Sequence, residues 1–192
     1  MTRNLESPSE RGWKNTRCGG FTLIELMVTI TLVAIVMGIG VPSYQNLVVK
    51  NRIQTQADEI RSSLAMARME AIRRGLWIRV CPGQNGCVGG KWHEGWNSFV
   101  DRDSNDTRDE GAGETHLEIH IRLDGGSTLT GADEVIFKSD GTAANSRRLK
   151  DDNALILCTA DNKKFPQHRR AIEVNAVGRV RVCGPPDCDV PC

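Results

Sequence analysis

The sequence is poor in aromatic residues and carries almost no net charge. Aromatic side chains make up 5% of its 192 residues, Tyr44 is the only tyrosine, and the formal net charge is +1. Sparse aromatics exclude a surface on which nucleic-acid bases stack. Balanced charge excludes nucleic-acid binding that depends on basicity spread over the whole molecule. Any contact with nucleic acid therefore has to rest on a local basic patch.

Sequence patterns of catalysis and metal binding are also missing. The chain has no Walker, Ser-His-Asp or Cys-His pattern. His116 and His120 flank Glu118, but the apolar alternation around them predicts a strand, in which four residues span about 13 Å. Two histidines that far apart cannot share one ion. We therefore expect no enzymatic activity, no metal and no cofactor.

An acidic segment invites comparison with a calcium-binding loop. Its Asp-x-Asp-x-Asn start fits an EF-hand, but Asp106 occupies the sixth position, where glycine is needed, and Ala112 replaces the glutamate of the twelfth. A solvated acidic turn between strands is the favoured interpretation. The polar residues of this segment are Asp101, Asp103, Asn105, Asp106, Asp109 and Glu110.

The most informative segment that is present is a run of 21 nearly all apolar residues, Phe21 to Val41, which follows a basic leader. As a helix, such a run crosses a hydrocarbon core of roughly 30 Å. Basic residues outnumber acidic ones in the leader, so the leader should stay cytoplasmic and the C-terminus should cross. The small residue Gly20 precedes the apolar run, whereas the cleavage site of an ordinary secretory signal follows it.

One acidic side chain, Glu25, lies one helical turn inside this run. A lone carboxylate in a membrane segment costs about 2.5–3.5 kcal/mol, so it normally marks a function. The alternative is a plain single-pass anchor with an accidental glutamate.

The sequence Gly-Phe-Thr-Leu-Ile-Glu at residues 20–25 resembles the processing site of type IV prepilins and type II secretion pseudopilins. The resemblance implies that a prepilin peptidase cuts between Gly20 and Phe21, that the new amine of Phe21 is N-methylated, and that the membrane helix stays on the mature protein. It also implies that Glu25 pairs with the Phe21 amine of a neighbouring subunit. Assembly would then neutralise a charge that lipid penalises.

Beyond Pro42 the pattern predicts further helix. Pro42 is expected to kink the helix rather than end it, because the next segment is again helical. Apolar residues recur mostly at spacings of three and four from Leu47 to Ala71, which is typical of an amphipathic helix with one stripe to bury. Gly75 is placed as the C-cap. From Phe21 to Arg74 the helix would be about 80 Å long.

After Gly75 the periodicity changes to two, which predicts about seven strands separated by clusters of Gly, Asn and Asp. One long helix followed by antiparallel strands is an α+β fold. The expected strands are Leu76–Cys81, Asn97–Asp101, Leu117–Leu123, Glu134–Phe137, Leu155–Cys158, Ala171–Val174 and Arg179–Val182.

Segments 92–101, 137–141 and 178–182 resemble the H-type pseudopilins and the related FimT/FimU-type minor pilins. The resemblance implies a pilin-like fold, with the long helix packed on an antiparallel β-sheet head. The implied partners are the inner membrane, the prepilin peptidase and the other pilins of a filament. The implied regions are a cleaved cytoplasmic leader (1–20), a transmembrane and assembly half of the helix (21–42), an amphipathic half (43–75) and a β-rich periplasmic head (76–192).

Six of the seven cysteines follow the predicted membrane segment, where disulfides persist. Cys18 lies in the leader. Cys81 and Cys87 enclose a glycine-rich loop, and their spacing suits no common zinc ribbon, so a disulfide between them is the natural interpretation.

The other four cysteines allow three pairings. Joining Cys158 to Cys183 would tie the last strand into the sheet, and Cys188 with Cys192 would then close a small C-terminal loop. Cys183 with Cys188 is the main competitor.

Basic residues gather near the C-terminus, where Glu173 is the single acidic residue among them. In the segment Gly178-Arg179-Val180-Arg181, a strand would place both arginines on one face, roughly 6–7 Å apart, with the valines facing inward. Two guanidinium groups at that separation can hold successive phosphates without reading bases. The other basic residues of this region are Lys163, Lys164, Arg169 and Arg170.

This segment resembles the Gly-Arg-x-Arg stretch by which FimT-type minor pilins are thought to bind DNA. The resemblance implies Gly178, Arg179 and Arg181 as contacts to double-stranded DNA, with the other basic residues as weaker candidates. The alternative is a solvated edge strand that uses cations against aggregation. The first hypothesis is therefore a minor pilin of a type IV pilus tip or priming complex that also binds DNA. The runner-up is an H-type minor pseudopilin of a type II secretion system without DNA binding.

Overall fold

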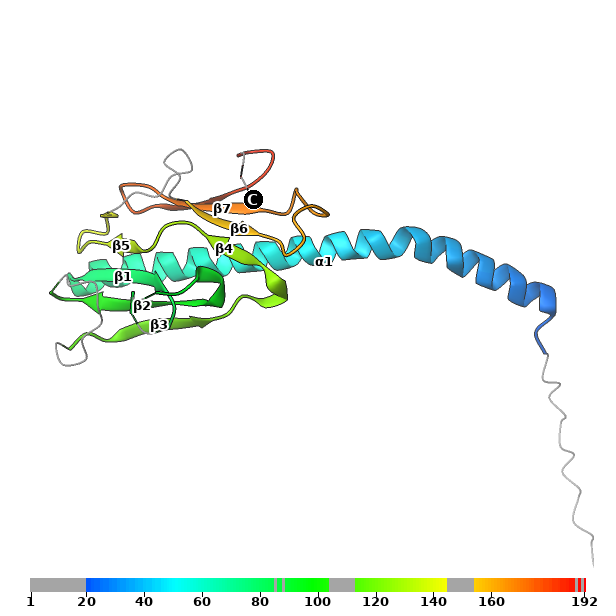
Figure 1. Ribbon diagram of the computed structural model, residues 1–192, viewed down its shortest axis with the longest axis horizontal. Helices are drawn as coiled ribbons and strands as arrows, with labels where there is room; N and C mark the ends of the chain where they lie inside the picture. Colours follow the sequence, from blue (N-terminus) through cyan, green and yellow to red (C-terminus); the bar gives the residue numbers. More distant parts are fainter. Residues whose placement is uncertain are drawn as a thin grey trace, which may run out of the picture. The chain divides into compact units, whose positions relative to one another are not determined.

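The computed structural model describes residues 20–84, 86–87, 89–103, 113–144, 154–188, 190 and 192. One long helix, α1 (Leu23–Arg74), is followed by strands that pair antiparallel in two four-stranded sheets (Figure 1). This confirms the predicted α+β class, with a long N-terminal helix ahead of an antiparallel head.

Helix α1 has the ends that its sequence dictates. Thr22 precedes it, and the Thr22 hydroxyl accepts a hydrogen bond from the Glu25 backbone N–H at 3.2 Å. The helix continues through Pro42 for a total of 52 residues. It stops before Gly75, whose φ of +66° is the left-handed conformation that a helix C-cap requires.

The chain divides into two compact units, residues 1–42 and 43–192. In the first unit every residue from Phe21 to Val41 is exposed. By length and composition, α1 is the one helix among the described residues that could cross a membrane. The second unit contains the core of the protein.

The first sheet has the strand order β3-β2-β1-β5 and the second the order β4-β6-β7-β8. Strand β4 is short and was not predicted from the sequence, and the division of the strands into two sheets was not predicted either. The strands are β1 (Trp77–Pro82), β2 (Gly95–Asp101), β3 (His116–Ile121), β4 (Thr128–Thr130), β5 (Val135–Phe137), β6 (Leu155–Cys158), β7 (Arg170–Val174) and β8 (Val180–Cys183).

The second half of α1 buries one stripe against strands of both sheets in a single apolar cluster. The stripe matches the predicted one except at its start, because Leu47 is 53% exposed. Burying each large aliphatic side chain of the stripe contributes about 1.5–3 kcal/mol. Its apolar residues are Ile53, Ala57, Ile60, Leu64, Ala67 and Ala71.

Two polar residues lie in the same stripe, and each has a partner in the head. Gln56 is buried, and its side-chain amide donates to the Asp124 backbone carbonyl at 2.9 Å. Ser63 accepts a hydrogen bond from the indole N–H of Trp96 at 3.0 Å. These bonds fix the helix against the head in one register, because an unmade buried bond is costly.

Three disulfides close the head. Cys81 is joined to Cys87, as the sequence predicts. Among the other four cysteines, the competing pairing is the one that forms: Cys183 with Cys188, and Cys158 with Cys192. The pairing of Cys158 with Cys183 is wrong.

The strand order explains this correction. Cys158 ends β6 and Cys183 ends β8, but β7 lies between these two strands. Two strands separated by a third are about 9–10 Å apart. A disulfide needs Cα atoms within about 7 Å, so it cannot join residues on alternate strands of a sheet.

The exposed helix and an arginine-lined groove

The first half of α1 presents an apolar surface with one carboxylate on it. Phe21 is 84% exposed and Leu32 is 57% exposed. In the part of the chain that the structure describes, no cation forms an ion pair with the Glu25 side chain. Within the described residues, no other part of the chain covers these apolar side chains or pairs with Glu25.

Strand β8 shows the predicted alternation. Val180 and Val182 pack against the core cluster, while Arg179 and Arg181 are exposed. β8 is also an edge strand of its sheet. The phosphate-binding interpretation and the edge-protection interpretation both require exposed cations at this edge, and the exposure of Arg179 and Arg181 agrees with either one.

The two arginines open into a groove between β8 and α1, with a volume of about 460 Å³. Arg170 also lines the groove, and so does Arg61 of α1. The acidic lining residues are Asp58 and Asp187. Four arginines against two aspartates leave the groove with an excess of positive charge.

Arg61 was missed because no sequence pattern relates it to β8. The structure brings it there by packing α1 beside the edge of the second sheet. Its guanidinium lies 3.8 Å from the Asp58 carboxylate, one turn earlier on the helix. A surface pair of this kind is weak, so it leaves Arg61 able to exchange partners.

Gly178, predicted as a DNA contact, is buried and determines the shape of the turn before β8. Its φ is +76°, and a Cβ there would come within 2.0 Å of the Gly141 carbonyl oxygen. The Arg68 side chain spans this turn and donates to the carbonyls of Gly141 and Val177, each at 2.9 Å. Only glycine fits this position, which positions Arg179 at the start of the strand.

The other predicted basic residues do not line the groove. Lys163, Lys164 and Arg169 belong to the β6–β7 loop, residues 159–169, which contacts α1 through Lys164 and Gln167. The Lys164 ammonium donates to the Gln45 side-chain carbonyl at 3.2 Å, and the Gln167 amide is 3.4 Å from the Asn46 side-chain oxygen. The basic region of the sequence therefore forms two separate surfaces.

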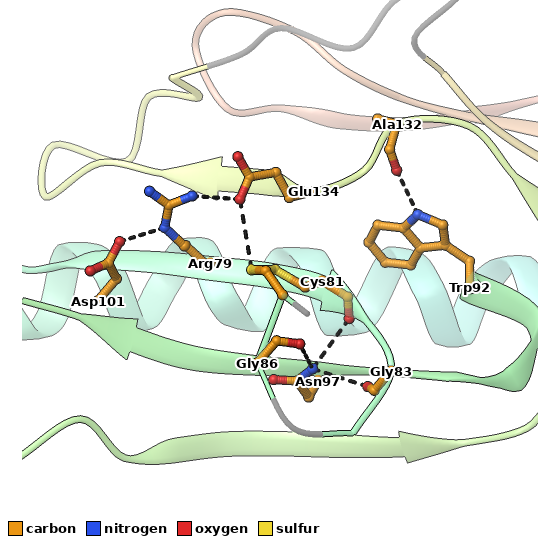
Figure 2. The surroundings of a disulfide bond; sticks show 10 residues. Arg79, Cys81, Gly83, Gly86, Trp92, Asn97, Asp101, Ala132 and Glu134 are labelled. Atoms are coloured by element: carbon orange, nitrogen blue, oxygen red, sulfur yellow. Dashed lines mark hydrogen bonds and ion pairs between the residues drawn. A yellow bond between two sulfur atoms is a disulfide. The ribbon is translucent and has the colours of Figure 1, made fainter. Parts of the chain in front are cut away.

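A buried polar network lies beside the Cys81–Cys87 disulfide (Figure 2). Arg79 of β1 is 4% exposed and forms ion pairs with Asp101 of β2 and with Glu134, which precedes β5. Burial lowers the pKa of Arg79, but the two carboxylates outweigh burial and raise it, so the side chain stays charged. The pairs link the three neighbouring strands of the first sheet.

Asn97 organises the loop that this disulfide closes. Its side-chain amide points at the carbonyls of Gly83 and Gly86, at 3.0 and 3.1 Å, and at that of Cys81 at 3.4 Å (Figure 2). The loop is thus held by one covalent bond and by bonds from a buried side chain. This arrangement is structural, and both sulfurs of a disulfide are unavailable as thiolate ligands for a metal.

In the described part of the acidic segment, too, carboxylates have structural partners. One carboxylate oxygen each of Asp101, Asp103 and Glu114 lies within 4.8 Å of the others. Asp101 pairs with Arg79, and Glu114 accepts from the Arg102 backbone N–H at 2.8 Å. The remaining residues considered for a calcium loop, Asn105, Asp106, Asp109 and Glu110, lie outside the described residues.

The histidines flanking Glu118 lie on strand β3, as predicted. His120 stacks on Trp96, with ring centroids 4.3 Å apart, and its Nε2 is 2.8 Å from a Glu118 carboxylate oxygen. His120 therefore acts as a packing residue that holds the edge strand to the sheet.

A long helix with an exposed apolar first half, followed by a disulfide-closed antiparallel head, defines a pilin-like subunit. The family model for the type II transport protein GspH matches residues 56–178, and the prokaryotic N-terminal methylation motif matches residues 15–41. The chain belongs to the GspH family. It has the structural role of a minor pilin or pseudopilin, whose N-terminal apolar helix fits an inner-membrane anchor and whose family assembles with other pilins in filaments.

Two solved structures support the fold. Two crystal forms of the type IV minor pilin FimU of Pseudomonas aeruginosa match with TM-scores of 0.53 and 0.51 and with 18% and 19% identity. The matches cover 73% and 72% of this chain and 93% and 96% of FimU. The minor pseudopilin EpsH of the Vibrio cholerae type 2 secretion system is 12% identical, with a TM-score of 0.47 over 70% of this chain and 98% of EpsH. No curated protein sequence matches the chain.

Proposed function

We propose that the chain is a minor pilin of the tip or priming complex of a type IV pilus. A prepilin peptidase removes the leader after Gly20, the new amine of Phe21 is methylated, and residues 21–42 hold the subunit in the inner membrane with its head in the periplasm. The observation that carries this proposal is the fully exposed, nearly all apolar surface of residues 21–41, whose single charged side chain is Glu25 near its start.

The position of Glu25 favours the assembled filament over the lipid bilayer. In the membrane its carboxylate is penalised. In a filament the same residue meets the terminal amine of a neighbouring Phe21, and the pair satisfies both groups in an apolar surrounding. Glu25 therefore makes the lipid environment unfavourable for the helix. Through its pair with the neighbouring amine, it also favours transfer of the subunit into the filament.

Processing is tested by Gly20→Trp. The bulky side chain is expected to block the peptidase and to leave full-length protein in the membrane, as seen by mass spectrometry of the N-terminus. Gly40→Trp is the control, because Gly40 lies in the same apolar run and no atom lies within 4 Å of where its Cβ would be. A Gly20→Trp chain that still matures to Phe21 contradicts the assigned site.

The filament system is tested by deletion of the gene in its own host. Loss of surface pili, with secretion of exoproteins intact, is the expected result for a minor pilin. Loss of secretion with normal piliation would assign the chain to a type II secretion pseudopilus instead.

A second function, binding of double-stranded DNA, is favoured by the arginine groove. The exposed Arg179, directly before the edge strand β8, and Arg181 within it supply two guanidinium groups, and Arg61 and Arg170 extend the positive surface. Guanidinium groups hold phosphates in paired hydrogen bonds and read no base from there. We therefore expect weak binding that is independent of sequence.

The fragment 43–192 is suited to test this, because among the described residues the core begins at Ile53. Its affinity for unrelated duplexes should be similar and should fall steeply as salt rises. Arg179→Gln with Arg181→Gln should reduce the salt slope by about two phosphate contacts. Single Arg61→Gln and Arg170→Gln changes should have smaller effects.

Lys163→Gln with Lys164→Gln is the matched control, since it removes the same charge from a surface outside the groove. If the wild-type fragment shows no binding at low salt, or the arginine pair can be lost without effect, the arginines only protect the edge strand.

A further inference from the structure

The β6–β7 loop and the first turns of α1 after Pro42 form a surface that filament assembly and the arginine groove leave unexplained. Tyr44, Gln45, Val48 and Val49 of the helix line a shallow groove with Lys164 and Phe165 of the loop. We call Tyr44, Val48, Lys163, Lys164 and Phe165 the juxtamembrane surface.

The chemistry of this surface is aromatic and apolar with a basic rim. Tyr44 is 67% exposed and Val48 is 42% exposed, while Phe165 is half-buried. Both lysines are exposed, and the Lys164 ammonium lies 5.2 Å from the centre of the Phe165 ring. Aromatic rings beside lysines are typical of the boundary between hydrocarbon and water.

The loop holds this arrangement through hydrogen bonds at its base. Asp161 caps the turn by accepting from the Lys164 backbone N–H at 3.1 Å, and the bonds to Gln45 and Asn46 hold the loop on the helix. Burial, together with the nearby Arg170 and Lys50, lowers the pKa of His168. This disfavours a charge on His168, whereas Lys163 and Lys164 are exposed cations of the loop.

The position along the chain places this surface at a bilayer boundary. Tyr44 follows Val41, the last residue of the apolar run, by three positions, or about 4–5 Å of helix rise. The headgroup layer extends about 5–7 Å beyond the hydrocarbon on each side. When residues 21–41 lie in lipid, this rise leaves Tyr44 within the headgroup layer. The loop lies next to it, because Lys164 is hydrogen-bonded to the neighbouring Gln45.

We propose that the juxtamembrane surface binds the anionic phospholipid headgroups of the membrane in which the helix is anchored. Phe165 and Tyr44 contact the upper acyl region, and Lys163 and Lys164 pair with phosphates. DNA is the less suitable partner here, because the loop offers two flexible point charges next to an apolar surface, without the paired guanidinium groups of the groove. The contact would hold the head against the bilayer until the subunit is extracted into a filament.

The first test measures co-sedimentation of the fragment 43–192 with vesicles of phosphatidylglycerol and phosphatidylcholine in equal parts. Binding is expected there, and none to pure phosphatidylcholine. Lys163→Gln with Lys164→Gln should weaken binding about 30-fold, from about 1 kcal/mol for each lysine at the surface. Arg179→Gln with Arg181→Gln, which removes equal charge, should change it by less than about 2-fold.

Three results overturn the proposal: no binding of the wild-type fragment to anionic vesicles, equal losses in the two double variants, or a lysine pair that lowers DNA affinity and leaves vesicle affinity intact. Because the same two double variants are also titrated with DNA, failure here is distinguishable from failure of the DNA function. Circular dichroism of each variant establishes that it is folded.

The second test uses the full chain in its membrane. With Phe165→p-benzoylphenylalanine, irradiation should attach phospholipid to the protein, which mass spectrometry detects. Ile119→p-benzoylphenylalanine is the control, because Ile119 is a 50% exposed apolar side chain on β3 of the other sheet. Lipid attachment at both positions, or at neither, contradicts a specific headgroup contact.

Discussion

The two halves of α1 belong to one continuous helix but differ in what covers their apolar side chains and pairs with their carboxylates. Between residues 21 and 42 every side chain is exposed, and Glu25 has no cation paired with it among the described residues. Between residues 53 and 71 a stripe is buried in the head. Near its end Glu70 accepts hydrogen bonds from Arg73 and Arg74, three and four residues later.

This difference separates folding from assembly within one helix. The buried stripe and Glu70 of the second half have their partners within this chain, so substitutions there should lower the free energy of unfolding. The exposed side chains of the first half are left for lipid or other subunits to cover. Substitutions there should leave the head folded and should change membrane insertion or filament assembly.

The largest loss of stability is expected when the C-terminal segment is released from the head. Cys158→Ser with Cys192→Ser opens a loop with a sequence separation of 34 residues. Loop entropy predicts a cost of about 4 kcal/mol, against about 2 kcal/mol for the short Cys81–Cys87 loop. Denaturant unfolding of the fragment 43–192 measures both. Equal costs would indicate that loop entropy does not dominate.

The oxidation state is checked first by mass mapping of this fragment without reductant. Three linked peptides with the pairings found here are expected. Six free thiols would contradict the oxidised head.

A smaller loss is expected from the buried stripe, and it compares the two halves directly. Leu64 is 1% exposed, so Leu64→Ala should lower the free energy of unfolding of the head by about 3 kcal/mol. Leu32→Ala removes the same atoms from the exposed half and should leave that free energy unchanged. Thermal unfolding of both full-length variants in detergent is the measurement. Equal shifts in Tm would contradict the division of the helix.

The smallest effect concerns Glu70. Hydrogen bonds from Arg73 and Arg74 lower its pKa from 4.5 to about 2. A carboxylate with a lowered pKa stabilises the folded state above its unfolded pKa, and this contribution is lost as the pH falls through the folded value. Glu70→Gln should therefore lower Tm by no more than about 3 °C at pH 7. The difference should shrink between pH 4.5 and pH 2. A difference that persists at pH 2 would have another cause.

Local patterns in the sequence predicted much of this protein. The apolar run, the cap at Gly75 and the alternation around Val180 were sufficient for the helix, its end and the outward direction of Arg179 and Arg181. These features depend on neighbours a few residues away, so single-sequence periodicity contains them.

Features that depend on distant parts of the chain were not predicted. The disulfide of Cys158 with Cys192 depends on β7 separating β6 from β8. The groove depends on α1 bringing Arg61 to β8, and the separation of Lys164 from it depends on the loop contacting Gln45. Strand order and the packing of a loop on the helix depend on residues far apart in the sequence, so no local pattern predicts them.

Incorporation of a Glu25→Val subunit into sheared filaments tests the central claim most directly. The variant should insert into the membrane and lose its leader as the wild type does, since valine removes a penalised charge from lipid. Its amount in filaments, measured against the major subunit by quantitative mass spectrometry, should fall, because the Phe21 amine of its neighbour loses its partner. Incorporation at the wild-type level would contradict the account that Glu25 completes the exposed half of the helix through a neighbouring subunit.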